Sequence, residues 1–357
     1  KLIMPTESAS LSLLSVISLI SFFVVLLTNK FSEQIGNGIL LDHDFEKPQA
    51  FHKHLVPRSG GLASIISLTI FFILYYILFH KLLINYIILS ISVFSLGFLE
   101  DIKININPKY RLTLMIGIIL FFITFSSVDI RAVDLKFLNI LMDSQIFSTI
   151  FILLCFLFVI NGANLIDGFN GLLTIQLLII NIIFLLINLN NGHQDFATVI
   201  TAQVVVLLCF LLFNYPQAKM FLGDSGSYLF GALTAFNAIN THNLNIQISS
   251  FFFCIILFYL FFEVFFSFFR KIYMKKSPLK PDSKHLHMLL FNFLNKSQKF
   301  KDSNYLNSTI INLIYFSLIL PSVFFSDNGF VCRYWFFSLL LIYIVFYLLL
   351  YSFEKKQ

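Results

Sequence analysis

Charged residues are scarce in this chain. They make up 12% of its 357 residues, whereas soluble proteins average about 25%. Hydrophobic residues make up 58%, and the mean hydropathy is +0.86. A soluble globular fold is therefore excluded.

Cysteine motifs and a cleavable leader are also lacking. Cys155, Cys209, Cys254 and Cys332 show no CxxC spacing, so we expect neither a disulfide framework nor a zinc site. No secretory signal with a small-residue cleavage site stands out, and we expect the first apolar run to be retained as a span. Strands of alternating polarity are absent as well, which argues against a transmembrane β-barrel.

Long apolar runs dominate what is present. Runs of about 20 residues, the length that crosses a bilayer as a helix, recur from end to end. They predict an all-α, polytopic membrane protein in which residues 1–357 form one integral-membrane domain. We count eleven spans, near residues 9–27, 62–80, 83–99, 112–127, 146–160, 172–188, 197–213, 226–240, 248–268, 309–325 and 334–352.

Lys and Arg set the expected orientation, because cytoplasmic loops are enriched in both. The segments after odd-numbered spans, together with the C-terminus, hold 19 of the 24 basic residues. We therefore predict a cytoplasmic C-terminus and a periplasmic N-terminus. The unusual polar stretches all lie in the predicted cytoplasmic segments, at residues 43–61, 100–101, 161–172, 221–231 and 280–291.

The stretch FLGDSGSYLFG, Phe221–Gly231, is the centre of this set. Its glycines allow close backbone approach, and Ser225 or Ser227 is suited to cap the following helix. Asp224 then lies near the positive end of that helix, where an anion or a metal–phosphate group is also favoured. The plainer alternative is that Asp224 only caps a helix in a loop.

Glu100 and Asp101 end an apolar run, SVFSLGFLED. An acidic pair at a helix C-terminus opposes the helix dipole, so another group must offset its charge. The candidates are a divalent cation, a basic group of a substrate, or the nearby Lys103, Lys109 and Arg111. The alternative is a pair solvated by headgroup water.

The stretch NGANLIDGFNGL, residues 161–172, places amides and a carboxylate close together. If it is helical through Asp167, Asn164 and Asp167 lie on one face at i, i+3 and are positioned to bind the same ligand. An interfacial turn rich in Asn and Gly explains the glycines but not Asp167.

Histidines and basic residues mark two further stretches. His52, Arg58 and the double glycine at 60–61 lie in a loop before a span. His285 and His287 follow a Lys-rich run, which favours phosphate binding or proton handling over zinc, for which a third ligand at suitable spacing is lacking. Interfacial histidines at headgroup level are the alternative.

One acid lies inside an apolar run. Glu263 is expected to have a partner because intramembrane carboxylates are costly. Arg270, two turns further on, is the structural candidate.

Together these groups suit a metal-held diphosphate at a membrane surface. Carboxylate oxygens suit Mg²⁺, with Mn²⁺ as the alternative, bridging phosphate oxygens. The cations suit a polyanionic substrate, and the location suits one whose other end is a lipid.

These motifs resemble the polyprenyl-phosphate N-acetylhexosamine-1-phosphate transferase family. NxxNxxDGxxGL, FxGDSGS, the acidic pair, PRxGG and the HxH loop occur in order over about residues 42–291. The resemblance implies transfer of an N-acetylhexosamine-1-phosphate from a UDP-sugar to undecaprenyl phosphate, with release of UMP and a requirement for Mg²⁺. It also implies a bacterial inner-membrane protein with a cytoplasmic active site.

The resemblance also implies roles for individual residues. Asp224 and Asp167 would bind the metal, and Asp101, with Glu100, would orient or deprotonate the lipid phosphate. Asn164 and Asp167 would hold the nucleotide sugar, while the histidines would contact its diphosphate. The full set of substrate-binding candidates is His52, Arg58, Asn161, Asn164, Asn170, Lys109, His285 and His287.

Three positions depart from the family pattern. Glu100 replaces the usual first Asp of the pair, Asn170 stands where many members have a second Asp, and Met288 replaces a third His. The glycan-initiating branch, which starts O-antigen and related glycans, therefore fits better than the peptidoglycan branch, whose members are phospho-MurNAc-pentapeptide transferases.

Other classes of function stay open. A non-enzymatic lipid transporter needs ionisable groups along a mid-membrane path, and a non-catalytic assembly partner needs no turnover. The expected partners are a UDP-N-acetylhexosamine, undecaprenyl phosphate and the bilayer, with no nucleic acid. Homodimer formation is left open.

Overall fold

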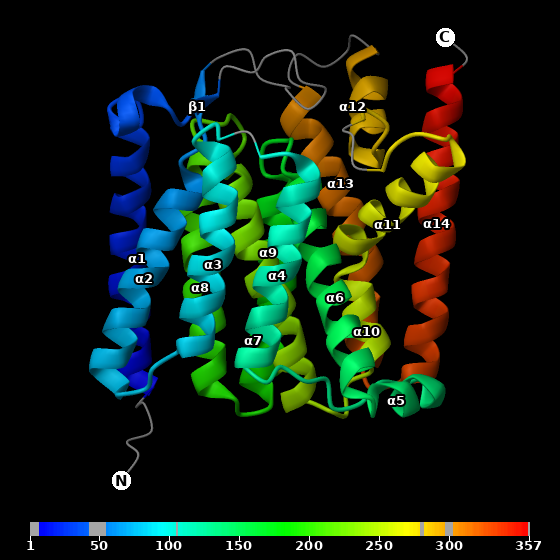
Figure 1. The fold of residues 1–357 in the computed structure, drawn as a ribbon, viewed down its shortest axis with the longest axis horizontal. Coiled ribbons are helices and arrows are strands. Elements are labelled where there is room, and N and C mark those ends of the chain that lie inside the picture. The colour runs from blue at the N-terminus through cyan, green and yellow to red at the C-terminus, as the bar shows by residue number, and fades with distance from the viewer. Residues whose placement is uncertain (1–6, 43–54, 105, 279–281, 297–302, 356–357) are drawn as a thin grey trace.

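The computed structural model describes residues 7–42, 55–104, 106–278, 282–296 and 303–355. Within these ranges the chain is mainly helical, and its sheet is one antiparallel pair of short strands, β1 (Leu41–Asp42) and β2 (Val56–Pro57). The long helices run side by side as a bundle with two opposite faces (Figure 1). The all-α class is therefore confirmed.

Most of the long helices alternate in direction along the chain (Figure 1). The first half contains α1 (Glu7–Lys30), η1 (Ile35–Gly38), α2 (Gly60–Phe79), α3 (Ile84–Asp101), α4 (Pro108–Phe125), α5 (Lys136–Met142), α6 (Gln145–Ile166) and α7 (Leu172–Asn190). The second half contains α8 (Gln194–Asn214), α9 (Gly223–Leu244), α10 (Ser250–Ile256), α11 (Phe258–Tyr273), α12 (Leu286–Lys296), α13 (Ser303–Ile319), η2 (Leu320–Phe325) and α14 (Gly329–Lys355).

The predicted spans coincide with these helices. Over the described ranges, nine helices are long and apolar enough to cross a membrane, or ten if the pair α10–α11, bent by 77°, is one span. The remaining predicted span, 226–240, falls on α9, which has sufficient length but too much polarity to qualify. The short helices α5 and α12 were not expected and lie at the lower and upper faces (Figure 1).

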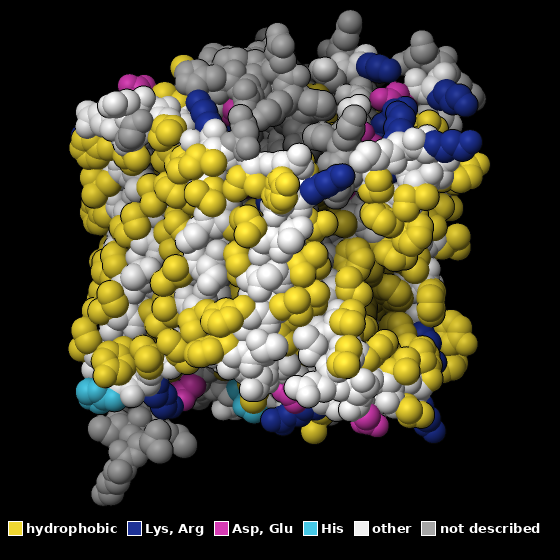
Figure 2. Space-filling view, viewed as in Figure 1, with side chains coloured by type: hydrophobic (Ala, Val, Ile, Leu, Met, Phe, Trp, Pro, Cys, Tyr) yellow, Lys and Arg dark blue, Asp and Glu magenta, His cyan; other side chains and the backbone are white. Residues whose placement is uncertain are grey.

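The outer surface matches a lipid environment. Figure 2 shows a broad band of hydrophobic side chains across the middle of the visible face, with charged side chains above and below it. Large apolar side chains such as Leu19, Ile77 and Leu212 are exposed on α1, α2 and α8. Apolar exposure of this extent is expected where a surface faces hydrocarbon.

The polar helix α9 lies inside the bundle. It packs against α2, α3, α6 and α7, and most of its side chains are buried. Because neighbouring helices shield it from lipid, α9 can carry hydroxyl and amide side chains that a lipid-facing helix would avoid.

A ladder of amides and hydroxyls joins α7 to α9. Asn181 donates to Thr234 and Asn188 donates to Thr241, each at 3.0 Å. Asn237 adds a bond to the Asn181 side chain at 2.9 Å. The acceptors and donors recur every seven residues on both helices, which keeps them on one face. The ladder therefore fixes the axial position of α9.

Two ends of the chain mark the two faces. α1 begins at the lower face and α14 ends at the upper face, where α12 and β1 also lie (Figure 1). We call this upper face the site face, because α3 ends and α9 begins there.

The break between α10 and α11 lies beside a close helix contact. A Cβ on Gly162 of α6 would lie 2.0 Å from the carbonyl oxygen of Leu260. Only glycine allows this approach, so α6 packs directly against the backbone of α11.

Candidate functional site

The end of α3 fixes the first turn of α9. Gly223 has φ +77°, a left-handed conformation that favours glycine. The backbone N–H groups of Asp224 and Ser225 donate to the two carboxylate oxygens of Asp101, each at 2.9 Å, and the Ser225 hydroxyl donates as well. Asp101 therefore caps α9 from another helix, at the end where negative charge is favoured.

Close backbone packing surrounds this turn. A Cβ on Gly61 would lie 2.2 Å from Ser225 Oγ, and a Cβ on Gly97 would lie 2.5 Å from the Asp224 carbonyl oxygen. The N–H of Gly61 donates to the carbonyl of Leu222 at 2.8 Å. Glycines on α2 and α3 thus hold the start of α9, which explains the double glycine at 60–61.

The charge of the acidic pair is offset from two sides. Asp101 is 1% exposed, and the positive N-terminal end of α9 offsets its charge. Sequence reasoning missed this partner. Arg111, one of the expected candidates, lies 3.7 Å from Glu100. Lys109 is exposed at the start of α4. The role of Asp101 and Glu100 toward a lipid phosphate stays a prediction.

Asp224 lies at the junction of α4, α6 and α9. Its side chain is 22% exposed, and Oδ1 accepts a hydrogen bond from Asn164 at 3.0 Å. Arg111 lies 3.5 Å from Oδ2, so the same guanidinium faces both Asp224 and Glu100. Asn164 also donates to Ser227 Oγ at 3.1 Å. The structure thus brings together polar residues from three of the sequence motifs, namely Glu100, Asn164, and Asp224 with Ser227.

Asp167 follows the last turn of α6. Over the described ranges, no side chain donates a hydrogen bond to its carboxylate. Burial and then the negative charges of Asp224 and Asp101 raise the pKa of Asp167 well above its usual value, while the charge of Arg58 acts in the opposite sense. A carboxyl group in this electrostatic environment favours a cationic ligand.

The two neighbouring asparagines make structural contacts. Asn161 donates to the Leu157 carbonyl of its own helix at 2.7 Å. The side chain of Asn170 donates to the Pro216 carbonyl at 2.9 Å, and its N–H donates to Asn304 at 2.9 Å. Asn170 therefore connects the loop after α6 to the loop after α8 and to α13. Substrate binding by both residues stays a prediction.

Arg58 is held by a residue that sequence reasoning missed. Its Nη2 and Nε lie 2.9 and 3.1 Å from Asp42 Oδ2. Asp42 ends β1 beside β2, and this pairing over sixteen residues has no local sequence signal. His52 lies outside the described residues.

The prediction that Arg270 is the partner of Glu263 is wrong. Glu263 Oε1 lies 3.0 Å from His285 Nδ1, and Oε2 accepts from the Tyr343 hydroxyl. Arg270 instead pairs with Asp282 at 3.0 Å. Two helical turns place Arg270 about 10 Å from Glu263 along α11, so it meets the loop that follows α11.

The histidines lie at the start of α12. His285 and His287 are both buried, with nearly parallel rings whose centroids are 5.5 Å apart. The edge of Phe169, from the loop after α6, meets His287 at 5.7 Å between ring centroids. The HxH stretch therefore lies beside the loop that carries Asp167.

Two carboxylates fit a metal that arrives with its substrate. Over the described ranges, no three His, Cys, Asp or Glu side chains form a ready-made metal cluster. Asp167 and Asp224 nevertheless supply hard oxygen donors, and Mg²⁺ sites commonly use one or two carboxylates plus substrate phosphates and water. These residues therefore suit a Mg²⁺ ion that is bound together with a diphosphate. They do not form a preformed site that would hold the metal by protein ligands alone.

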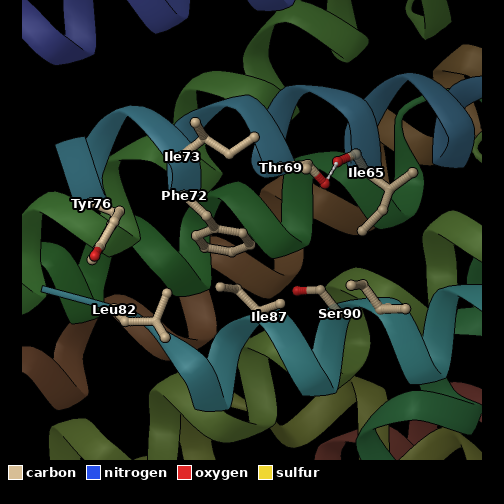
Figure 3. Close-up of a pocket in the computed structure, with 9 residues that line it drawn as sticks. Ile65, Thr69, Phe72, Ile73, Tyr76, Leu82, Ile87 and Ser90 are labelled. Atoms are coloured by element: carbon tan, nitrogen blue, oxygen red, sulfur yellow. Dashed lines mark hydrogen bonds between the residues drawn. The ribbon is translucent and has the colours of Figure 1, made fainter.

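An apolar groove lies apart from this cluster. Ile65, Phe72 and Ile73 of α2 face Ile87 and other residues of α3 across it (Figure 3). Ser90, at its α3 side, is eleven residues from Asp101, or about 16 Å along the helix. The groove lacks charged lining residues and is not part of the polar site.

Apolar helices and a polar site at one face define this chain as a polytopic membrane protein with a carboxylate–amide–guanidinium centre. The family model for glycosyl transferase family 4 matches residues 83–242, which include the acidic pair, Asn164, Asp167 and Asp224. This match, together with the relatives described next, confirms the resemblance drawn from the motifs.

Two kinds of relative are similar to this chain. An undecaprenyl-phosphate alpha-N-acetylglucosaminyl 1-phosphate transferase from Thermotoga maritima is 26% identical over 302 residues, which cover 79% of this chain and 89% of that protein. A phospho-N-acetylmuramoyl-pentapeptide-transferase from Streptococcus pneumoniae strain CGSP14 is 32% identical over 218 residues, which cover 57% of this chain and 65% of that protein. The first match is longer, which supports the glycan-initiating branch.

Proposed function

We propose that this protein transfers an N-acetylhexosamine-1-phosphate, from GlcNAc or a 6-deoxy-N-acetylhexosamine, from a UDP-sugar to undecaprenyl phosphate. The reaction is the first membrane step of O-antigen or another cell-surface glycan. The observation that carries the proposal is the convergence of Asp224, Asp167, Asn164 and Arg111 at one face of a membrane bundle. A site at this face can meet a water-soluble nucleotide and a lipid phosphate together.

The chemistry is a phosphoryl transfer. An oxygen of undecaprenyl phosphate forms a bond to the β-phosphorus of the UDP-sugar, and the bond from that phosphorus to the bridging oxygen breaks, releasing UMP. Asp224 and Asp167 would hold Mg²⁺, which offsets phosphate charge when bound. Arg111 and Arg58 add positive charge near the diphosphate, and Asn164 fixes the orientation of Asp224.

We also propose the arrangement in the membrane. All eleven predicted segments, α9 and the bent pair included, cross the bilayer as one domain of a bacterial inner-membrane protein, with the N-terminus periplasmic and the site face cytoplasmic. The excess of Lys and Arg in the segments at that face supports this orientation.

The peptidoglycan reaction is the second candidate. Its substrate would be a UDP-MurNAc-pentapeptide, and the 32% identity to the pneumococcal relative favours it. The two candidates share a mechanism and differ in the sugar nucleotide.

Release of UMP by the purified full-length protein tests the proposal. The assay contains undecaprenyl phosphate, Mg²⁺ and one member of a panel of UDP-sugars that includes UDP-GlcNAc, a UDP-6-deoxy-N-acetylhexosamine and UDP-MurNAc-pentapeptide. We expect turnover with an N-acetylhexosamine nucleotide and a loss of about 100-fold or more in Asp224→Asn.

A matched control separates this loss from a general effect of removing an acid. Asp143→Asn changes an exposed carboxylate in the connection between α5 and α6 and should retain wild-type activity. Turnover only with UDP-MurNAc-pentapeptide would favour the second candidate. Absence of turnover with every nucleotide, or full activity in Asp224→Asn, would contradict a transferase and favour a transporter or an assembly partner.

A further inference from the structure

A buried carboxylate anchors the start of α12. Glu263 is 1% exposed and is one of the few charged residues within the membrane helices. Its Oε1 lies 3.0 Å from His285 Nδ1 and accepts from the Leu286 N–H at 3.2 Å. Its Oε2 accepts from the Tyr343 hydroxyl on α14. Three segments, α11, α14 and the loop before α12, are therefore joined at one side chain.

His285 faces a carboxylate at each ring nitrogen. Nδ1 meets Glu263, and Nε2 lies 3.5 Å from Asp282 Oδ1. Asp282 is itself held by Arg270 and by the N–H of Lys284, at 3.1 and 3.0 Å. The ring is 2% exposed. His285 therefore has no ring nitrogen left to offer a substrate.

His287 has a different environment. Its Nδ1 lies 3.4 Å from the Tyr259 hydroxyl, whereas its buried Nε2 has no hydrogen-bond partner over the described ranges. A buried polar nitrogen without a hydrogen-bond partner destabilises the folded protein unless a ligand supplies that partner. Burial lowers the pKa of His287 to about 3, so the ring is neutral near pH 7 and carries one N–H. In the tautomer whose Nδ1 accepts from Tyr259, that N–H is at Nε2.

The surroundings of His287 point toward the polar site. The Phe169 ring contacts the His287 ring in a T-shaped arrangement and belongs to the loop that begins with Asp167. A nucleotide sugar that reaches Asp167 therefore approaches the same loop, beside the unpartnered Nε2 of His287.

We propose that Glu263 is a positioning residue. Through His285 and the Leu286 N–H it fixes the first turn of α12, so that His287 presents Nε2 to the diphosphate of the nucleotide sugar while His285 makes no substrate contact. This inference rests on the proposed function for the identity of the ligand. It separates two histidines that the family resemblance treated alike.

Hydrogen–deuterium exchange tests the anchoring contact without turnover. In the full-length protein, Glu263→Leu should speed the exchange of peptides covering residues 285–290, because the acceptor for the Leu286 N–H is lost. Tyr343→Phe, which leaves the Glu263–His285 contact in place, should have a smaller effect of the same sign. Tyr315→Phe removes another buried tyrosine hydroxyl, one that donates to the Ile256 carbonyl, and should leave these peptides unchanged. Unchanged exchange in Glu263→Leu would overturn the proposal.

Kinetics test whether the effect reaches the substrate through His287. We expect Glu263→Leu to lower kcat about tenfold or more with little change in KM for the UDP-sugar. Glu263→Gln, which keeps an oxygen acceptor, should recover most of the activity. In a His287→Gln background with measurable residual turnover, Glu263→Leu and His285→Gln should each change kcat by less than about twofold.

Two kinetic results would contradict the inference or the proposed function. If the losses multiply in the His287→Gln background, Glu263 or His285 acts independently of His287 and the inference is wrong. If the wild-type protein turns over no UDP-sugar, the proposed function fails, and the exchange experiment alone decides whether Glu263 anchors α12.

Discussion

At the residue scale, two carboxylates in one cluster have different environments. Asp101 is buried, and both its oxygens accept hydrogen bonds from the first turn of α9. Asp224 is partly exposed and faces an amide and a guanidinium. The first carboxylate fixes the backbone on which the second is carried, so a change at Asp101 is expected to act on Asp224 through geometry.

Gly223 offers a test of this backbone geometry. Gly223→Ala should lower both stability and UMP release, because φ is +77° and the new Cβ would lie 2.7 Å from the Asp101 carboxylate oxygens. Strain of this kind is worth about 1–3 kcal/mol. Thermal unfolding in detergent and the UMP assay measure the two effects.

Gly117→Ala is the matched control. Gly117 lies in α4, and a Cβ there would meet no atom within 4 Å. Alanine is favoured over glycine in a helix by up to about 1 kcal/mol, so this variant should be as stable as wild type or more so. Equal behaviour of the two variants would contradict the close packing at Gly223.

The residues that sequence reasoning missed are long-range partners. The motifs identified Asp101, Asn164 and Asp224, because polar residues stand out among apolar runs. Asp42 and Tyr343 were missed because their contacts, with Arg58 and Glu263, depend on the folded arrangement. A tyrosine in an apolar run carries no signal of such a bond.

At the element scale, the amide ladder sets α9 against its neighbours. Asn237 connects three elements, because it donates to Gln203 of α8 at 2.8 Å and to Asn181 of α7, and accepts from Tyr86 of α3. Polar bonds between membrane helices average about 0.6 kcal/mol each in some systems. Their loss at one residue also leaves several buried groups unpaired.

Asn237→Leu should therefore destabilise the protein by about 1–3 kcal/mol. UMP release should fall as well, because the axial position of Asp224 depends on α9. Asn191→Leu changes an exposed amide beyond the end of α7 and should leave both unfolding temperature and turnover near wild type. An Asn237→Leu protein as stable as wild type would show that the ladder contributes little.

The loop between α11 and α12 is expected to respond to acid. Burial alone would raise the pKa of Asp282, but hydrogen bonds from Arg270 and the Lys284 N–H, and the charges of His285 and Arg270, lower it overall. A lowered pKa in the folded state contributes stability at pH values above the unfolded value of about 3.9. That contribution is lost as the pH falls through the folded-state pKa.

Asp282→Asn measures this contribution. The variant should unfold at a lower temperature than wild type at pH 7, because Arg270 loses its charged partner. The difference should shrink as the pH falls from about 4 through the lowered folded-state pKa of Asp282, because the wild-type carboxylate becomes protonated over that range. A difference independent of pH would assign the loss to packing.

At the scale of the whole molecule, hydropathy predicted the helices and their order. Bilayer thickness imposes a strong length constraint on apolar runs, so the segments could be placed from sequence. The break at Leu257 was not predicted, since no proline or glycine marks it. The convergence of the polar loops at one face could be predicted because consecutive spans alternate in direction. The side-chain contacts between those loops could not.

Cysteine labelling tests the proposed orientation. In a variant without the four native cysteines, Gly192→Cys, between α7 and α8, should react in intact cells with a membrane-impermeant thiol reagent. Lys219→Cys, between α8 and α9, should react only after the membrane is opened. The reverse pattern would place the site face in the periplasm.

The polarity of α9 has a consequence for biogenesis. On its own, this segment would partition poorly from the translocon into lipid. The helices that enclose it, α2, α3, α6 and α7, all precede it in the chain. These helices are synthesised first. We therefore expect α9 to enter the bilayer only after its protein neighbours have assembled, so that it packs against them and not against lipid.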